Sequence, residues 1–126
     1  MVDVAKQIEY WMRGSEEDFA AAQSLFEKGH FRHSLFFAHL AIEKMLKAHV
    51  ARQTEEIPPR IHNLIRLAGI AKLKLKPKKD EFLRDFNLYQ LEGRYPDTQQ
   101  ASIDKALARH ELLRAKEMLA WLKKRL

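Results

Sequence analysis

The sequence predicts an all-α fold, an up-and-down bundle of four to five helices with two long antiparallel helical hairpins. Two observations carry this prediction. Apolar residues recur in steps of three and four along most of the chain, which places them on one face of a helix. No stretch combines β-type alternation with the dipeptides that close β-hairpins. Because 126 residues suffice for one hydrophobic core, we expect residues 1–126 to form a single domain.

The first predicted helix covers about residues 2–28. Its apolar positions run from Val4 to Phe26 and keep their helical phase across Gly14, which favours one long helix over two that meet there. Gly29 is a typical helix stop.

Four more helical segments follow. Their boundaries are residues that end or interrupt helices, namely the Pro58-Pro59 pair and, further on, Gly93 and Pro96. Between these boundaries the apolar spacing predicts helices over about residues 31–52, 60–71, 78–91 and 99–125.

Positive charge is concentrated in the second half of the chain. The formal net charge is +6; residues 1–65 hold 8 basic and 9 acidic side chains, whereas residues 66–126 hold 15 and 8. This asymmetry is typical either of a solvated lysine-rich surface or of a protein with an anionic partner. The densest cluster is a predicted basic loop without an aromatic residue, formed by Lys72, Lys74, Lys76, Lys78 and Lys79 around Pro77.

Several classes of function are excluded by composition. The chain has no Cys, so it has no disulfide, zinc finger or thiol nucleophile. No apolar run approaches the roughly 20 residues of a membrane span, and the first residues do not resemble a signal peptide, so we expect a cytoplasmic protein without a membrane partner. No His-Glu-x-x-His, glycine-rich phosphate loop or Gly-x-Ser-x-Gly occurs, and we expect neither metal nor cofactor.

The second predicted helix carries a candidate phosphate site. Glu43 and Lys47 are four residues apart, in the favourable order for a helical ion pair, and Lys44 shares a side with Lys47. Spacing alone favours a surface salt bridge. The alternative is a pair of ammonium groups on a rigid helix that faces a phosphate.

The segment Arg94-Tyr95-Pro96 lies between two predicted helices. An arginine near a helix start can hold a phosphate, and Tyr95 can stack on a base. The alternative is a simple turn in which Asp97 or Thr98 caps the last helix. Both interpretations stay open at this point.

Six histidines invite catalytic or metal-binding interpretations. His62 is expected to open the third helix, and His49 and His110 fall on or near apolar faces. A structural histidine is the simpler interpretation for each.

An ordered set of residues that spans nearly the whole chain is similar to one known family. It comprises Trp11, Asp18, Gly29-His30-Phe31, Ser34, Phe37, Ala38, Ala41-Ile42-Glu43-Lys44, Lys47, His62-Asn63-Leu64, Leu67, Asn87, Tyr89 and Arg94-Tyr95-Pro96-Asp97. With this set the chain resembles the HEPN domain family. The resemblance implies a helical bundle that pairs as a homodimer. It also implies one of two activities: metal-independent endoribonuclease, as in toxins encoded beside a minimal nucleotidyltransferase antitoxin, or nucleotide binding.

The sequence departs from the nuclease motif of that family. The motif has an Arg and, four to six residues later, a His; here no His follows Arg94 through Ala101, and only Arg94 carries over. The similar spacing of Arg32 and His39 falls on the second helix and is treated as chance. We therefore expect a non-enzymatic domain that binds a nucleotide or RNA phosphate through Arg94 and Lys44, supported by Lys47, Tyr95 and, more weakly, His62.

Two alternatives remain. The first is an endoribonuclease in which His62 or His33 replaces the missing acid–base group. The second is an interaction module for a nucleotidyltransferase subunit, in which Glu43, Lys44 and Arg94 form a structural ion network. In either case Phe36 and Phe37 are reasonable contacts of a homodimer.

Overall fold

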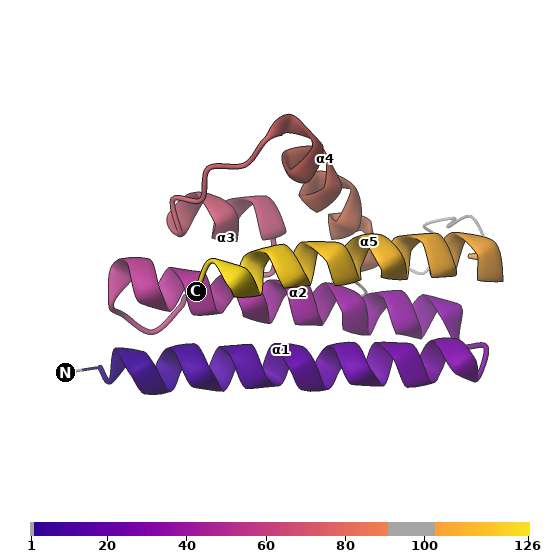
Figure 1. Cartoon of the computed structure of the whole chain (residues 1–126), viewed down its shortest axis with the longest axis horizontal. Coiled ribbons are helices and arrows are strands. Elements are labelled where there is room, and N and C mark those ends of the chain that lie inside the picture. Colours follow the sequence, from indigo (N-terminus) through magenta and orange to yellow (C-terminus); the bar gives the residue numbers. More distant parts are fainter. Residues whose placement is uncertain (1, 91–102) are drawn as a thin grey trace.

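Two long helices form an antiparallel hairpin at the amino-terminal end of the chain (Figure 1). The structure, a computed structural model, describes residues 2–90 and 103–126. Helix α1 (Val4–Glu27) is followed by α2 (Phe31–Thr54), and the chain reverses at Gly29, where φ is 82°. Such a positive φ is accessible to glycine at little cost.

Helix α2 is the central element of the bundle. It is buried at most positions between Ser34 and Ala51, and it packs against α1 on one side and α5 (Lys105–Lys124) on another. Figure 1 shows that α5 runs parallel to α2 and antiparallel to α1. The hydroxyl of Ser15 donates to the Ala41 carbonyl, and that of Ser34 donates to the Ala22 carbonyl. These two bonds in opposite directions hold α1 and α2 in close contact.

Shorter helices cover a further side of α2. They are α3 (Leu64–Ile70), α4 (Pro77–Phe86) and the 3₁₀ turn η1 (Asn87–Tyr89). The Asn63 side chain accepts bonds from the first turn of α3, and the Asn87 side chain accepts one from the Leu64 amide. Two asparagines thus join the start of α3 to the end of α4.

The hydrophobic core lies between α2 and the helices around it. Its largest fully buried apolar side chains are Leu35, Ile42, Met45, Leu46, Leu64, Leu67, Leu83, Phe86 and Leu122. The predicted all-α fold class is confirmed, and the described residues contain no strand.

The predicted helix boundaries need three corrections. The third helix begins at Leu64 rather than at residue 60, because Asn63 caps it. The fourth continues beyond Phe86 only as a 3₁₀ turn. The last helix begins at Lys105 rather than at residue 99, because Asp104 accepts the bond from its first turn. The expected caps Asp97 and Thr98 lie outside the described residues.

Candidate functional site

A cluster of polar side chains surrounds the buried carboxylate of Glu43 on α2. Lys47 Nζ donates to Glu43 Oε2 at 3.1 Å, and His62 Nδ1 lies 3.2 and 3.1 Å from the two carboxylate oxygens. His39 Nδ1 is 3.9 Å from Oε1 and is fully buried. We refer to these four residues as the Glu43 cluster.

Helical spacing and one loop assemble the cluster. His39, Glu43 and Lys47 are four residues apart, so they share one face of α2. His62 comes from the segment that precedes α3. The sequence predicted that His62 would open that helix. This prediction is wrong, because the N-cap is the next residue, Asn63. The asparagine bonds at the start of α3 hold this segment beside α2.

The members of the cluster differ in their access to solvent. The Lys47 side chain is 7% exposed and the His62 side chain is 40% exposed. Lys47 Nζ also lies 5.1 Å from the centre of the Trp11 ring, and the indole N–H of Trp11 donates to Gln7. Lys47 is thus held by a carboxylate and an aromatic ring, whereas His62 is the member that a ligand in solution can reach.

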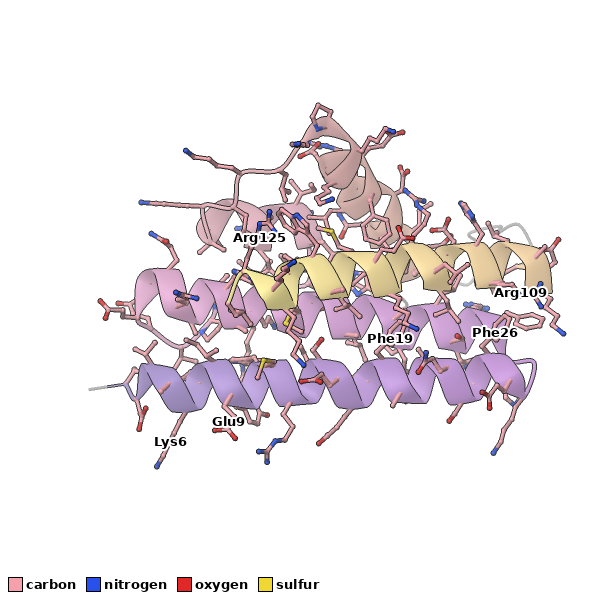
Figure 2. The ribbon with its side chains drawn as sticks, in the orientation of Figure 1. Lys6, Glu9, Phe19, Phe26, Arg109 and Arg125 are labelled. Carbon is pink, nitrogen blue, oxygen red and sulfur yellow. The ribbon has the colours of Figure 1, made fainter. Side chains whose placement is uncertain are left out.

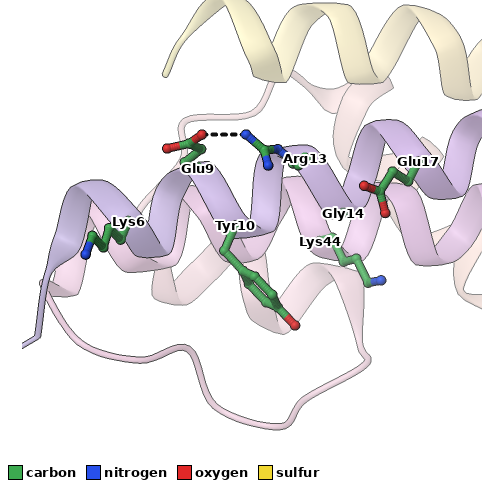
Figure 3. A pocket seen from close by; sticks show the side chains of 7 residues that line it. All are labelled: Lys6, Glu9, Tyr10, Arg13, Gly14, Glu17 and Lys44. Atoms are coloured by element: carbon green, nitrogen blue, oxygen red, sulfur yellow. Dashed lines mark hydrogen bonds and ion pairs between the residues drawn. The ribbon is translucent and has the colours of Figure 1, made fainter.

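Lys44 forms a different ion pair. Its ammonium is 2.8 Å from Asp18 Oδ2, and its side chain crosses α1 at Gly14, where an added Cβ would lie 3.1 Å from Lys44 Cδ. Figure 3 shows the adjacent cavity of about 410 Å³, in which Arg13 pairs with Glu9. Its lining mixes both signs of charge and consists of Lys6, Glu9, Tyr10, Arg13, Gly14, Glu17 and Lys44.

The structure brings together two of the five predicted site residues, Lys47 and His62, and gives Lys44 a separate partner. Arg94 and Tyr95 lie outside the described residues. Two contributions were not predicted from the sequence: His39 as part of the site, and Trp11 as the partner of Lys47. The four-residue spacing from His39 to Glu43 could have indicated that His39 belongs to the site. The contact of Lys47 with Trp11, in contrast, depends on how α1 packs against α2.

The described residues show neither a metal site nor a membrane-spanning helix. In residues 2–90 and 103–126, no group of three or more His, Asp or Glu side chains is arranged to hold a metal ion. No helix in this part of the chain is both long enough and apolar enough to cross a membrane.

Comparison with solved structures shows the same fold in two proteins. A crystal structure of TT1696 from Thermus thermophilus has a TM-score of 0.79 and 21% sequence identity, and the match covers 95% of this chain and 98% of that one. The crystal structure of ST0689, an archaeal HEPN homologue, has a TM-score of 0.72 and 20% identity, and the match covers 94% and 96% of the two chains. At these identities the likeness establishes the fold alone.

Comparison with families is more specific. None of the curated proteins matches the chain. A family model described as the HEPN domain matches residues 8–126, a range that contains the four residues of the Glu43 cluster as well as Arg94 and Tyr95. The chain therefore belongs to the HEPN domain family.

Proposed function

We propose that this HEPN domain binds a nucleotide or an RNA phosphate and does not cleave it. The observation that carries the proposal is the convergence of Lys47 and His62 on Glu43 from two separate segments. It produces a polar site beside the core with one solvent-accessible imidazole. The absence of a histidine between Arg94 and Ala101, where the nuclease motif would have one, supports binding rather than cleavage.

The proposed roles follow from charge and exposure. Arg94 supplies the phosphate contact, with Tyr95 for stacking and His62 at the accessible edge. Lys47 is neutralised by Glu43 and mostly buried, so its role is to position that carboxylate. Lys44 must leave or share Asp18 in order to meet an anion, which makes it a weaker phosphate contact than Arg94 in this proposal.

The proposal predicts a loss of affinity in single variants. Arg94→Ala and His62→Ala should each weaken ATP binding about tenfold or more, since each removes a charge-assisted hydrogen bond. Isothermal titration calorimetry on the full chain measures this. Arg32→Ala, which removes an exposed arginine near the start of α2, is the matched control and should bind as the wild type does. Equal affinities for wild type and Arg94→Ala contradict the proposed site.

A second candidate function, metal-independent RNA cleavage, is favoured by one contact. A histidine whose Nδ1 is held by a buried carboxylate is a common arrangement for proton transfer, and His62 has it. His33, the other candidate, is exposed, and its ring centre lies 6.5 Å from that of His30. Cleavage of single-stranded RNA in EDTA that stops in His62→Ala and persists in His33→Ala would establish this function.

The proposed setting is a cytoplasmic homodimer that works with a nucleotidyltransferase subunit, as in a toxin–antitoxin pair. Leu107 and Leu113 on α5 are large apolar side chains exposed to solvent, which supports a protein contact there. Phe36 and Phe37 on α2, the expected dimer contacts, are half-buried. Light scattering and co-expression with such a subunit test both parts of this proposal.

A further inference from the structure

The basic segment between α3 and α4 provides cations that no acidic group neutralises. Within the described part of the chain, Lys44, Lys47 and Lys123 form ion pairs, whereas none of the five lysines between residues 72 and 79 does. Four of the five, Lys72, Lys74, Lys76 and Lys78, are exposed.

The leucines between these lysines pack against the core, so the lysine side chains point into solvent. Leu73 and Leu75 are half-buried and pack against the core, while Lys74 and Lys76 are exposed. In an extended segment alternate side chains share a face and lie about 6.6 Å apart. The segment therefore presents a row of ammonium groups to solvent and anchors itself with leucines.

Tertiary structure adds the aromatic residue that this basic run lacks in sequence. Trp121 of α5 lies next to Lys79, which is in the first turn of α4. Lys79 Nζ is 4.9 Å and Arg125 Cζ is 4.0 Å from the centre of the Trp121 ring. Both distances are within the range of cation–π attraction, which holds the two cations in place. Figure 2 shows Arg125 at the carboxyl end of α5, at the opposite end of that helix from Arg109 and Phe26.

Acidic groups border this surface where α4 faces α5. A cavity of about 440 Å³ between α4 and α5 contains Glu81 and Glu117 as well as Lys78, Lys79 and Arg114. Asp80 is already paired with Arg84 at 2.7 Å. The lysines on the loop side, from Lys72 to Lys76, therefore keep their positive charge.

We propose that a surface formed by Lys72, Lys74, Lys76, Lys78, Lys79, Trp121 and Arg125 binds the backbone of single-stranded RNA. Rows of unpaired cations beside a partly exposed indole are what a sequence-tolerant single-strand site requires, because phosphates contact the cations and a base can stack on the exposed part of the indole ring. The inference rests on the proposed function for its ligand class and selects RNA over a free nucleotide. In this proposal RNA uses the Trp121 surface in addition to the site proposed above, whereas ATP uses only the latter.

The test is fluorescence anisotropy with a short labelled single-stranded RNA. The triple variant Lys74→Gln, Lys76→Gln, Lys78→Gln changes exposed side chains only, so it should fold normally. We expect it to bind RNA about tenfold more weakly at low salt, with the slope of log affinity against log salt reduced by about 2, since each lost phosphate contact removes about 0.7. The matched control is Lys28→Gln, Lys105→Gln, Lys116→Gln, which removes the same charge from exposed positions elsewhere and should bind within twofold of wild type.

The outcomes separate this inference from the proposed function. Equal weakening in the two triple variants would mean that net charge alone attracts RNA, and it would overturn the inference. Loss of RNA affinity in the surface variant with unchanged ATP binding supports it. If RNA binding survives in the Arg94→Ala and His62→Ala variants but is lost in the surface variant, the proposed site fails and the Trp121 surface stands.

Binding to anionic lipid vesicles without binding to RNA also overturns the inference. Trp121→Phe, which keeps an aromatic ring, should lower RNA affinity less than the triple lysine change.

Discussion

Glu43 and Lys47 are both nearly buried on the central helix, and each needs the other there. Removing a carboxylate from water is costly unless nearby positive charge and hydrogen bonds replace its hydration, and Lys47 and His62 supply both. The same contacts leave Lys47 little capacity for a ligand. At the scale of single residues, the cluster therefore combines a structural pair with one accessible histidine.

Glu43→Gln should be strongly destabilising, because it leaves the buried ammonium of Lys47 without a counter-charge. Breaking a buried pair in this way costs about 3 kcal/mol of unfolding free energy. Urea denaturation measures it. Glu9→Gln, which breaks the exposed pair with Arg13, is the control and should cost less than about 1 kcal/mol. In the Lys47→Met background Glu43→Gln should destabilise the protein much less, and an undiminished destabilisation there would argue against the pairing.

His49 predicts how stability depends on pH. Burial lowers its pKa below 6.5, with Arg52 and Arg125 acting in the same direction against the bond that its Nε2 donates to the Leu122 carbonyl. The native state therefore keeps this imidazole neutral while the unfolded chain takes up a proton. Stability should fall as pH decreases below about 6.5, and His49→Gln should reduce that slope in urea melts between about pH 7.5 and 5.

At the scale of elements, the hairpin of α1 and α2 depends on a turn that only one residue type fits well. Gly29 has a φ of 82°, and an added Cβ would meet no atom within 4 Å. Any cost of substitution there comes from the backbone and not from a clash. The sequence correctly placed the end of the first helix at this glycine because the conformational requirement is local.

Gly29→Ala should lower the free energy of unfolding by about 1 kcal/mol, which is the cost of placing a side chain in the left-handed region. Gly69 in α3 is the matched control: it has a negative φ and equal space, so Gly69→Ala should stabilise by about 0.5 kcal/mol. Thermal melts of both variants show whether each substitution lowers or raises the stability. A stabilising Gly29→Ala would contradict the turn geometry.

Helix starts were less predictable than helix faces. Apolar spacing identified the buried sides of the first four α-helices but not that of α5, where Leu107 and Leu113 are exposed. It also does not say which residue begins the first turn of a helix. Asn63 and Asp104 decide this, because their side chains accept the otherwise unpaired amides of α3 and α5. Neither of them was predicted as a cap from the sequence; the expected caps of the last helix, Asp97 and Thr98, lie outside the described residues.

At the scale of the whole molecule, folding divides the cations into two sets. Lysines on α2 are used to neutralise Asp18 and Glu43, whereas the lysines between α3 and α4 stay unpaired in the described residues. The unpaired lysines from Lys72 to Lys78 therefore supply part of the positive excess of the second half of the chain. The site residues expected from the sequence included Lys44 and Lys47 and none of the lysines from 72 to 79, because the acidic neighbour of Lys44, Asp18, lies far away in the sequence.

The sequence by itself determined the all-α class, the long first hairpin and the HEPN family, because helical periodicity, a glycine turn and an ordered set of motif residues are all local or linear properties. Tertiary structure alone decided that Lys44 meets Asp18, that His62 meets Glu43, and that Trp121 lies beside Lys79. Each of these contacts joins residues far apart in the chain. Their formation depends on how the helices pack, and no spacing rule within one element contains that information.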